Sequence, residues 1–118
     1  MLTYERAYQS ATVSEHAGDL AGAETAYRRS VELNPWNGRA HFGLSRMFYM
    51  AQRFSEALEE VVRAEQTYTD SHQEVLRARI LEQMGSGDDA LAAYRRAVWL
   101  DPTLTSIQAD IERLSNAR

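Results

Sequence analysis

The 118-residue chain contains no cysteine, and it has only two prolines and six glycines. The absence of cysteine excludes disulfides and thiolate metal ligands. No apolar run is longer than Met47–Ala51, which is far short of the roughly 20 residues of a membrane-spanning helix. The N-terminal residues lack the basic and apolar segments of a signal peptide. We therefore expect a cytoplasmic protein.

The chain also lacks a strong excess of either charge. It has 13 basic and 17 acidic residues, which give a formal net charge of −4. Nucleic-acid-binding domains usually have a basic face, and basic clusters attract proteins to anionic membranes. We therefore expect no nucleic acid and no membrane as partner. Ala, Leu, Glu, Arg and Gln dominate and β-branched runs are absent, so the composition favours an all-α fold.

Two stretches of the sequence are nearly identical: AYRRSVELNP at 26–35 and AYRRAVWLDP at 93–102. A more divergent third copy lies between them. Its Ala57 follows Ala23 by 34 residues and precedes Ala90 by 33. The chain therefore contains three copies of one unit, with a period of 34 or 33 residues.

Within each copy, apolar and small residues recur at helical spacing, which predicts two helices. The small residues align in two columns: Ala11, Ser45 and Ala78, and Ala23, Ala57 and Ala90. The expected turns lie at 18–19, 52–53 and 85–87. We expect the second helix to cross the first at the small residues, because a larger side chain there would force the two helices apart.

A 33- or 34-residue helix-turn-helix repeat with an alanine, an aromatic residue four positions later and a closing proline resembles the tetratricopeptide repeat. Two copies match the second half of that signature: Ala23-Tyr27-Pro35 and Ala90-Tyr94-Pro102. The middle copy matches part of the first half, with His41 in place of the usual tryptophan: His41-Leu44-Ser45-Phe48. The resemblance implies an α-solenoid of three antiparallel helix pairs, in one domain over residues 1–118. The repeats are expected at about 4–37, 38–70 and 71–103.

The C-terminal segment TLTSIQADIERLSNAR predicts a seventh helix, at about 104–116, that caps the last repeat. A repeat array needs such a cap because its last pair exposes the face that a next copy would cover. Thr105 and Gln108 form the expected capping box. The apolar stripe of this helix consists of Leu104, Ile107, Ile111 and Leu114. We expect the helix to cover Trp99, and Trp36 to pack in its turn.

No pattern in the sequence indicates enzyme chemistry. His16, His41 and His72 occupy three different positions in their repeats, and none belongs to a metal-binding motif. The glycines at 85–87 follow no strand and precede no lysine, so they form a helix–helix turn rather than a phosphate-binding loop. We therefore expect a protein that is not an enzyme and has no metal or cofactor.

The resemblance implies that the first helix of each copy lines a concave groove, which holds an extended peptide or a partner helix. By the repeat register, the groove residues are Tyr8, Thr12, Arg39, Phe42, Arg46, Tyr49, Val75 and Arg79. Tyrosine and arginine are enriched at binding hot spots, and together they suit a protein segment with apolar and acidic residues. The alternative for Phe42 and Tyr49 is packing against the neighbouring copy.

Family members that hold the acidic tails of heat-shock chaperones use a clamp of Lys, Asn, Asn, Lys and Arg. The corresponding residues here are Tyr8, Thr12, Gly43, His72 and Leu76, and none of them matches. A chaperone-tail adaptor is therefore not expected. Two other functions stay open: a self-assembly module, such as a homodimer, because no further helix covers the first one, and a regulatory piece of a larger protein.

Overall fold

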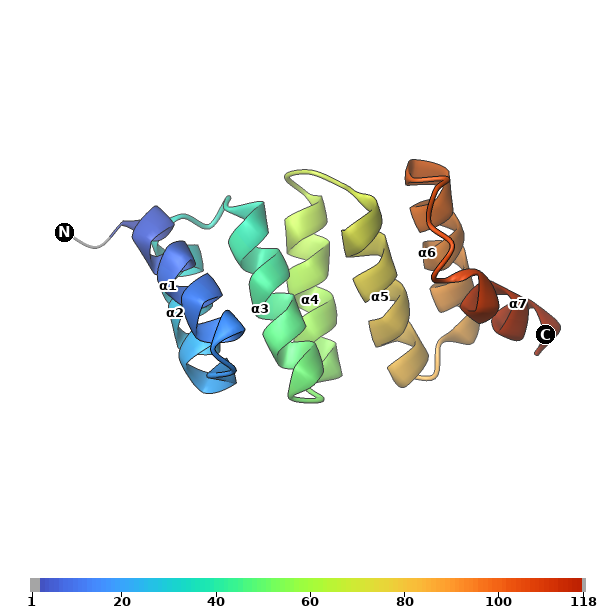
Figure 1. Cartoon of the computed structure of the whole chain (residues 1–118), viewed down its shortest axis with the longest axis horizontal. Helices are drawn as coiled ribbons and strands as arrows, with labels where there is room; N and C mark the ends of the chain where they lie inside the picture. Colours follow the sequence, from blue (N-terminus) through green and yellow to red (C-terminus); the bar gives the residue numbers. More distant parts are fainter. Residues whose placement is uncertain (1–2, 118) are drawn as a thin grey trace. The chain divides into compact units, whose positions relative to one another are not determined.

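The computed structural model describes residues 3–117, which form seven α-helices and no strand (Figure 1). The helices are α1 Tyr4–His16, α2 Leu20–Leu33, α3 Gly38–Met50, α4 Phe54–Glu65, α5 Ser71–Gln83, α6 Gly87–Leu100 and α7 Gln108–Asn116. Consecutive helices pack as the pairs α1–α2, α3–α4 and α5–α6. These pairs confirm the predicted all-α fold. Within residues 3–117, none of the helices is long and apolar enough to span a membrane.

The chain divides into two compact units, of which the first ends at Tyr68 and the second begins at Thr69. In the first unit, α2 also packs against α3, and in the second, α6 also packs against α7. The division lies close to the expected boundary between the second and third repeats. The single domain over residues 1–118 stays a prediction.

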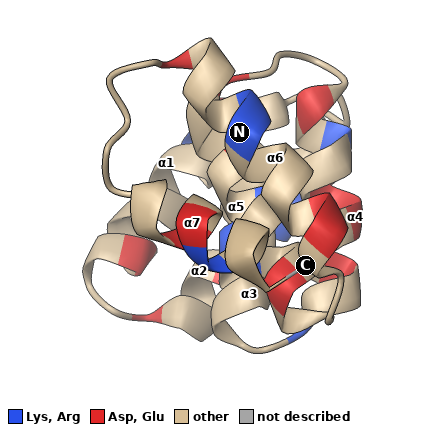
Figure 2. Ribbon diagram, turned by 90° about the vertical axis from the view of Figure 1, so that its right-hand side faces the viewer, with Lys and Arg blue, Asp and Glu red and all other residues tan. Residues whose placement is uncertain are grey.

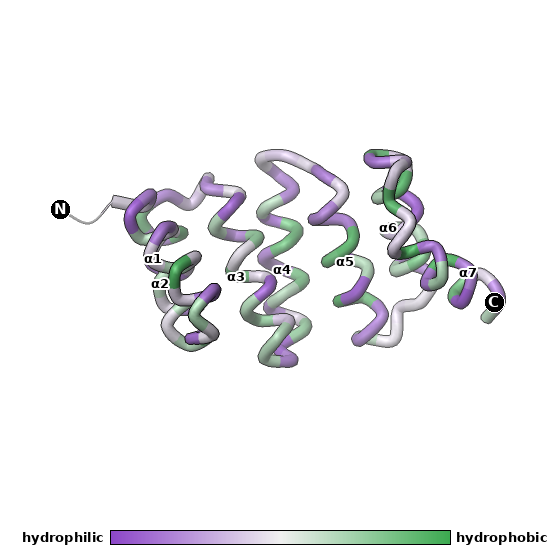
Figure 3. The backbone as a smooth tube through the Cα atoms, viewed as in Figure 1, coloured by the Kyte–Doolittle hydropathy of each residue, from purple (hydrophilic) through white to green (hydrophobic). Residues whose placement is uncertain are grey.

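Hydrophobic and hydrophilic stretches are interleaved along the helices (Figure 3), and the buried residues of α2 and α4 recur at helical spacing. Three helices begin at a side chain that accepts a hydrogen bond from a first-turn amide, as a good N-cap does. The capping residues are Thr3 for α1, Asp19 for α2 and Asp70 for α5. At α5, the side chain of Gln73 also accepts from the backbone of Asp70, which completes a capping box.

Small residues lie where the paired helices approach each other closely. The alanines of the second helices have no exposed surface: Ala23, Ala57 and Ala90. The hydroxyl of Ser45 in α3 donates a hydrogen bond to the backbone oxygen of Ala57 in α4 at 2.7 Å. Between α2 and α3, a Cβ atom added to Gly43 would collide with the ring of Tyr27. The columns of small residues therefore mark close helix contacts, as predicted.

The turn inside each pair uses a left-handed backbone position. The φ angle is 82° at Gly18, 62° at Gln52 and 80° at Gly85. Glycine adopts this conformation readily, whereas the Cβ of any other residue makes it unfavourable. The middle copy therefore carries backbone strain at Gln52 that the two other copies avoid.

The C-terminal helix is shorter than predicted. It begins at Gln108 rather than near 104, and no side chain caps its first turn. The expected capping box is wrong, because the amide of Gln108 donates to the backbone oxygen of Thr105 at 3.2 Å and the Thr105 side chain makes no cap. The apolar contacts are nevertheless as predicted. Ile107 is fully buried with Ala93 and Tyr94 of α6. The rest of the stripe packs around it: Leu104, Ile111 and Leu114.

Both tryptophans are exposed, so the prediction that they pack is wrong. The exposed fraction is 82% for Trp99 and 76% for Trp36. The C-terminal segment packs on the face of α6 that carries Ala93, Tyr94 and Ala97, and this packing leaves Trp99 in water. Trp36 lies in the α2–α3 loop, where its backbone amide donates to the side chain of Asn34 at 3.1 Å.

His41 is buried and ties the α2–α3 loop to α4. Its Nδ1 lies 2.6 Å from Oε2 of Glu60, and its Nε2 lies 2.7 Å from the backbone oxygen of Pro35. Both partners offer acceptor oxygens, so the two contacts favour the ring in which each nitrogen carries a hydrogen. Burial by itself would lower the pKa of His41, but the hydrogen bonds to Glu60 and Pro35 outweigh it and raise this pKa.

We expect the free energy of unfolding to fall as the pH rises through the raised pKa of His41. Below the ordinary histidine pKa of about 6.5, the ring is protonated in both states and the pair contributes fully. Above this pH, His41 loses its proton in the unfolded chain but keeps it in the folded protein. The stabilisation by the His41–Glu60 pair therefore decreases and is lost once the pH passes the folded-state pKa of His41. Urea unfolding across this range should show the loss for the wild type and a flatter profile for His41→Gln. Equal profiles for the wild type and His41→Gln would contradict the assignment.

We expect Ala23→Leu to lower the free energy of unfolding by about 1–3 kcal/mol, because the larger side chain overpacks a close helix contact. Ala21→Leu is the matched control: Ala21 is exposed on the same helix, and the change should cost less than about 0.5 kcal/mol. Denaturant unfolding measures both. Equal losses in the two variants would show that Ala23 is not at a close contact.

Candidate functional site

Six of the eight predicted groove residues lie on α1 and α3 of the first unit, and each is at least partly exposed. They are Tyr8 and Thr12 on α1, and Arg39, Phe42, Arg46 and Tyr49 on α3. The other two lie on α5 of the second unit. There Val75 packs against the cluster around Ala78 and Tyr94, while Arg79 is exposed.

Arg46 is held by a network that the sequence analysis missed. Its Nη2 donates to Oε1 of Glu15 at 2.7 Å, and its Nε donates to Oε2 at 3.1 Å. The hydroxyl of Tyr27 donates to the same Oε1 at 2.6 Å. The guanidinium also lies over the ring of Phe42, 4.9 Å from its centroid. The charge of Arg46 is therefore balanced inside the protein, and Arg46 and Phe42 form one stacked surface.

The network fixes the protonation of its members. Burial raises the pKa of Glu15, but the hydrogen bonds from Arg46 and Tyr27 outweigh it and lower this pKa. Burial and the Glu15 carboxylate both raise the pKa of Tyr27. At neutral pH the carboxylate is therefore charged and the phenol keeps its proton. Neither group is poised for acid–base chemistry, which works best with a pKa near the operating pH.

The second unit contains an equivalent Tyr–Glu–Arg network 67 positions later, but without the stacked ring, because Ala109 corresponds to Phe42. The hydroxyl of Tyr94 donates to Oε1 of Glu82 at 2.7 Å, and Nη2 of Arg113 donates to Oε2 at 2.8 Å. Arg113 belongs to α7, so this helix provides the guanidinium that the first helix of a further repeat would provide. Both networks have the same spacing in the sequence, with a tyrosine 12 residues after the glutamate and an arginine 31 residues after it. This spacing could have predicted them.

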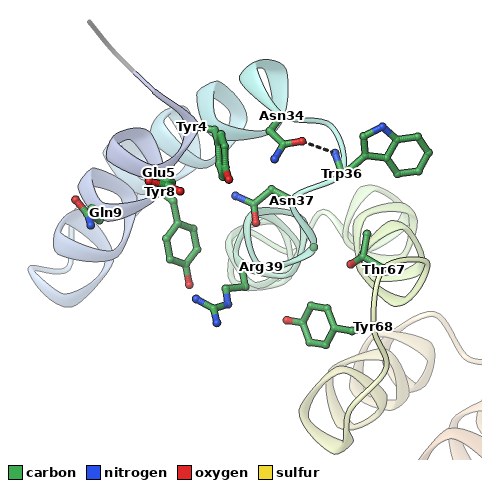
Figure 4. A pocket seen from close by; sticks show the side chains of 11 residues that line it. Tyr4, Glu5, Tyr8, Gln9, Asn34, Trp36, Asn37, Arg39, Thr67 and Tyr68 are labelled. Carbon is green, nitrogen blue, oxygen red and sulfur yellow. Dashed lines mark hydrogen bonds between the residues drawn. The ribbon is translucent and has the colours of Figure 1, made fainter.

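A pocket of about 630 Å³ lies at the N-terminal ends of α1 and α3 (Figure 4). Aromatic and polar side chains line it: Tyr4, Tyr8, Trp36 and Tyr68, with Glu5, Asn34, Asn37 and Arg39. In Figure 4 the guanidinium of Arg39 lies between the rings of Tyr8 and Tyr68, and Trp36 points away from the other side chains. Among residues 3–117, Arg39 makes no hydrogen bond or ion pair. Its charge is therefore available to a partner.

The remaining predicted residues have other contacts. The hydroxyl of Thr12 donates to the backbone oxygen of Gln9 at 2.8 Å. The ring of Tyr49 packs against Phe54 of α4, with 5.8 Å between centroids. Neither residue lines the pocket. The pocket's loop residues escaped prediction because the repeat register assigns binding residues only to the first helices. In the described part of the chain, no cluster of three or more metal-ligating side chains occurs.

A family model of the tetratricopeptide repeat matches residues 5–72, which is more than half of the chain. The chain belongs to the tetratricopeptide repeat family. No protein of curated function matches it in sequence. The predicted family is thus confirmed by sequence and by fold.

Several solved tetratricopeptide structures have a similar fold. The Arabidopsis OM64 domain aligns with a TM-score of 0.92 and 17% identity, over 98% of this chain and 96% of that one. The first such domain of Spaghetti (RPAP3), bound to the HSP90 peptide SRMEEVD, aligns with a TM-score of 0.92 and 14% identity, over 98% of this chain and 92% of that one. YrrB, a tetratricopeptide protein with an unusual peptide-binding site, aligns with a TM-score of 0.85 and 17% identity, over 92% of this chain and 57% of that one. At these identities the likeness concerns the fold alone.

We expect Glu15→Gln to lower the free energy of unfolding by roughly 1–2 kcal/mol, because the partly buried Arg46 loses its charged acceptor. Glu5→Gln is the matched control on the same helix. Glu5 is exposed and makes no hydrogen bond or ion pair within residues 3–117, so its loss should cost less than about 0.5 kcal/mol. Denaturant unfolding of the two variants tests this, and equal stabilities would mean that the network contributes nothing.

Proposed function

We propose that this tetratricopeptide protein is an interaction module that binds a partner peptide or helix over α1 and α3. The family consists of protein-interaction scaffolds, and the peptide-binding proteins of similar fold support a protein partner. Fold alone does not identify a ligand. The choice of this surface therefore has to rest on its own residues.

The observation that carries the proposal is the pocket of about 630 Å³ that Tyr8 and Arg39 line. Tyrosine rings offer a large apolar contact area and a polar tip, and an unpaired guanidinium binds carboxylates with two parallel hydrogen bonds. A segment in which an aromatic or aliphatic residue stands next to Asp or Glu suits this combination. We infer that such a segment is the ligand.

The two arginines of α3 have different roles in this proposal. Arg46 contributes a flat surface with Phe42, because Glu15 already neutralises its charge. Arg39 contributes the charge that a ligand carboxylate would meet. Arg46→Glu is therefore a poor probe of binding, since it would place a second carboxylate beside Glu15 and disturb the fold.

A chaperone tail is not the partner that these residues favour. Three of the clamp positions lie in the first unit, as Tyr8, Thr12 and Gly43, and they offer neither a lysine nor an asparagine. Gly43 has no room for a longer side chain because it abuts the ring of Tyr27. The likeness to the HSP90-bound Spaghetti domain supports a peptide ligand without supporting that particular peptide.

End-to-end assembly through α1 also receives little support. Three residues of α3 are buried in the first unit: Ala40, Gly43 and Met47. Their counterparts 34 positions earlier are exposed: Arg6, Gln9 and Val13. Two of these three are polar, so the outer face of α1 suits water better than another repeat. A homodimer through this face is therefore the weaker proposal.

We expect a phage-displayed library of random peptides, selected on the wild-type protein, to be enriched in Asp or Glu beside aromatic or aliphatic residues. Fluorescence polarisation with a selected peptide should show binding at least about tenfold weaker for Arg39→Glu, which is a loss of about 1.4 kcal/mol. Added salt should weaken wild-type binding as well. Arg6→Glu, the same change at an exposed arginine outside the pocket, should bind like the wild type. Selected peptides without acidic residues, or unchanged binding by Arg39→Glu, would refute the proposal.

A further inference from the structure

The α2–α3 loop belongs to two pockets at once. Three of its residues line the pocket of Tyr8 and Arg39, here called the peptide pocket: Asn34, Trp36 and Asn37 (Figure 4). Two residues of the same loop line a second pocket, of about 330 Å³, together with the buried ring of His41: Pro35 and Trp36. The loop therefore connects His41 to the peptide pocket.

A short contact with His41 ties this loop to α3. Nε2 of His41 lies 2.7 Å from the backbone oxygen of Pro35. The amides of Trp36 and Asn37 both donate to Asn34 at 3.1 Å, so these two hydrogen bonds stay within the loop. The Asn37 side chain donates to the hydroxyl of Ser30 in α2 at 3.3 Å, which is long for a hydrogen bond. Loss of the His41 contact would therefore loosen the segment that carries Trp36.

Deprotonation of His41 would break the contact with the loop and keep the contact with α4. Nδ1 of the ring lies 2.6 Å from Oε2 of Glu60, and Arg63 donates to Oε1 of the same carboxylate at 2.7 Å. A neutral imidazole has a single N–H, and a charged acceptor makes a stronger hydrogen bond than a neutral one. The remaining hydrogen therefore stays on Nδ1. Nε2 then becomes an acceptor, and it faces the Pro35 oxygen with no hydrogen between them.

The charged groups that act on this ring come from α4, whose acidic positions are red in Figure 2. Burial lowers the pKa of His41, but the hydrogen bonds to Glu60 and Pro35 and the charge of Glu60 outweigh it, while Arg63 opposes them. From α2, the side chain that lines the pocket of His41 is Val31. Two charged residues of α2 instead share another pocket with Glu60: Arg28 and Glu32. The ring therefore changes its charge above the ordinary histidine pKa of about 6.5.

We propose that the protonation state of His41 regulates peptide binding: the protonated ring holds the α2–α3 loop in the form that completes the peptide pocket, and the neutral ring releases it. The inference rests on the proposed function, because it concerns the same pocket. A peptide that contacts Trp36 and Asn37 binds the held loop better than the released one, and this difference in affinity is what couples the two events. Binding therefore weakens as the pH rises, and a bound peptide makes His41 keep its proton to a higher pH.

Fluorescence polarisation with a selected acidic peptide, from about pH 5.5 to about pH 8.5, tests the coupling, because carboxylates and guanidiniums keep their charge over this range. Wild-type binding should weaken by roughly two- to tenfold, the effect of one hydrogen bond, with a midpoint above about pH 6.5. His41→Gln should show no such transition. His16→Gln, a change at an exposed histidine at the other end of α1, should keep the wild-type profile. A wild-type affinity that does not change with pH, or the same transition in His41→Gln, would overturn the proposal.

The loop of the protein without peptide gives a measurement that does not depend on the proposed function. NMR order parameters of the Cα–H bonds of Pro35 and Trp36 should fall over the same pH range in the wild type and stay level in His41→Gln. In Glu60→Gln the fall should move to lower pH, because the carboxylate that favours the charged ring is gone. Circular dichroism confirms that each variant stays folded over this range.

The two measurements together distinguish the inference from the function on which it rests. Order parameters that stay level in the wild type would overturn the regulation, even if acidic peptides bind through Arg39. A loop that responds to pH, combined with unchanged peptide binding by Arg39→Glu, would instead refute the proposed peptide site and with it the regulation of that site.

Discussion

The close approach of paired helices at small residues is the constraint on which the other contacts depend. With Ala23 and Ala57 at the crossings, the backbones come near enough for long polar side chains to bridge from one helix to another. Tyr27 of α2 reaches Glu15 of α1, and His41 of α3 reaches Glu60 of α4. Larger residues at the crossings would separate these partners beyond hydrogen-bond distance.

Arginine pairing determines where positive charge remains without a partner on the described surface. The chain has no lysine, so all 13 basic residues are arginines, and a guanidinium can pair with a carboxylate and stack on a ring at once. Arg46 does both, with Glu15 and Phe42. Most such pairs neutralise charge locally, which leaves the few arginines without carboxylate partners as the sites with charge to offer. Arg39 is one of them, in a pocket lined by aromatic rings.

Helix pairs, turns and helix contacts were predictable because they depend on spacing within or between copies, which can be counted along the chain. The pairing of Arg46 was not, because Glu15 lies 31 residues away and the contact depends on how one pair packs on the next. The expectation that Trp36 and Trp99 pack was wrong, because the α2–α3 loop and the face of α6 that the C-terminal segment covers leave both side chains in water. The start of α7 was also misplaced: the helix begins at Gln108, and the Thr105 side chain makes no cap.

Arg113 has a consequence for the evolution of repeat number. Because α7 presents to Glu82 the same group that Arg46 presents to Glu15, the third copy meets an equivalent neighbour whether a cap or another repeat follows it. A duplicate of the third repeat inserted before α7 would therefore meet compatible chemistry at its C-terminal junction. The second copy would not, because it has Tyr49 and Val61 where the third has Glu82 and Tyr94, so α7 suits an array that ends in a copy of the first or third type.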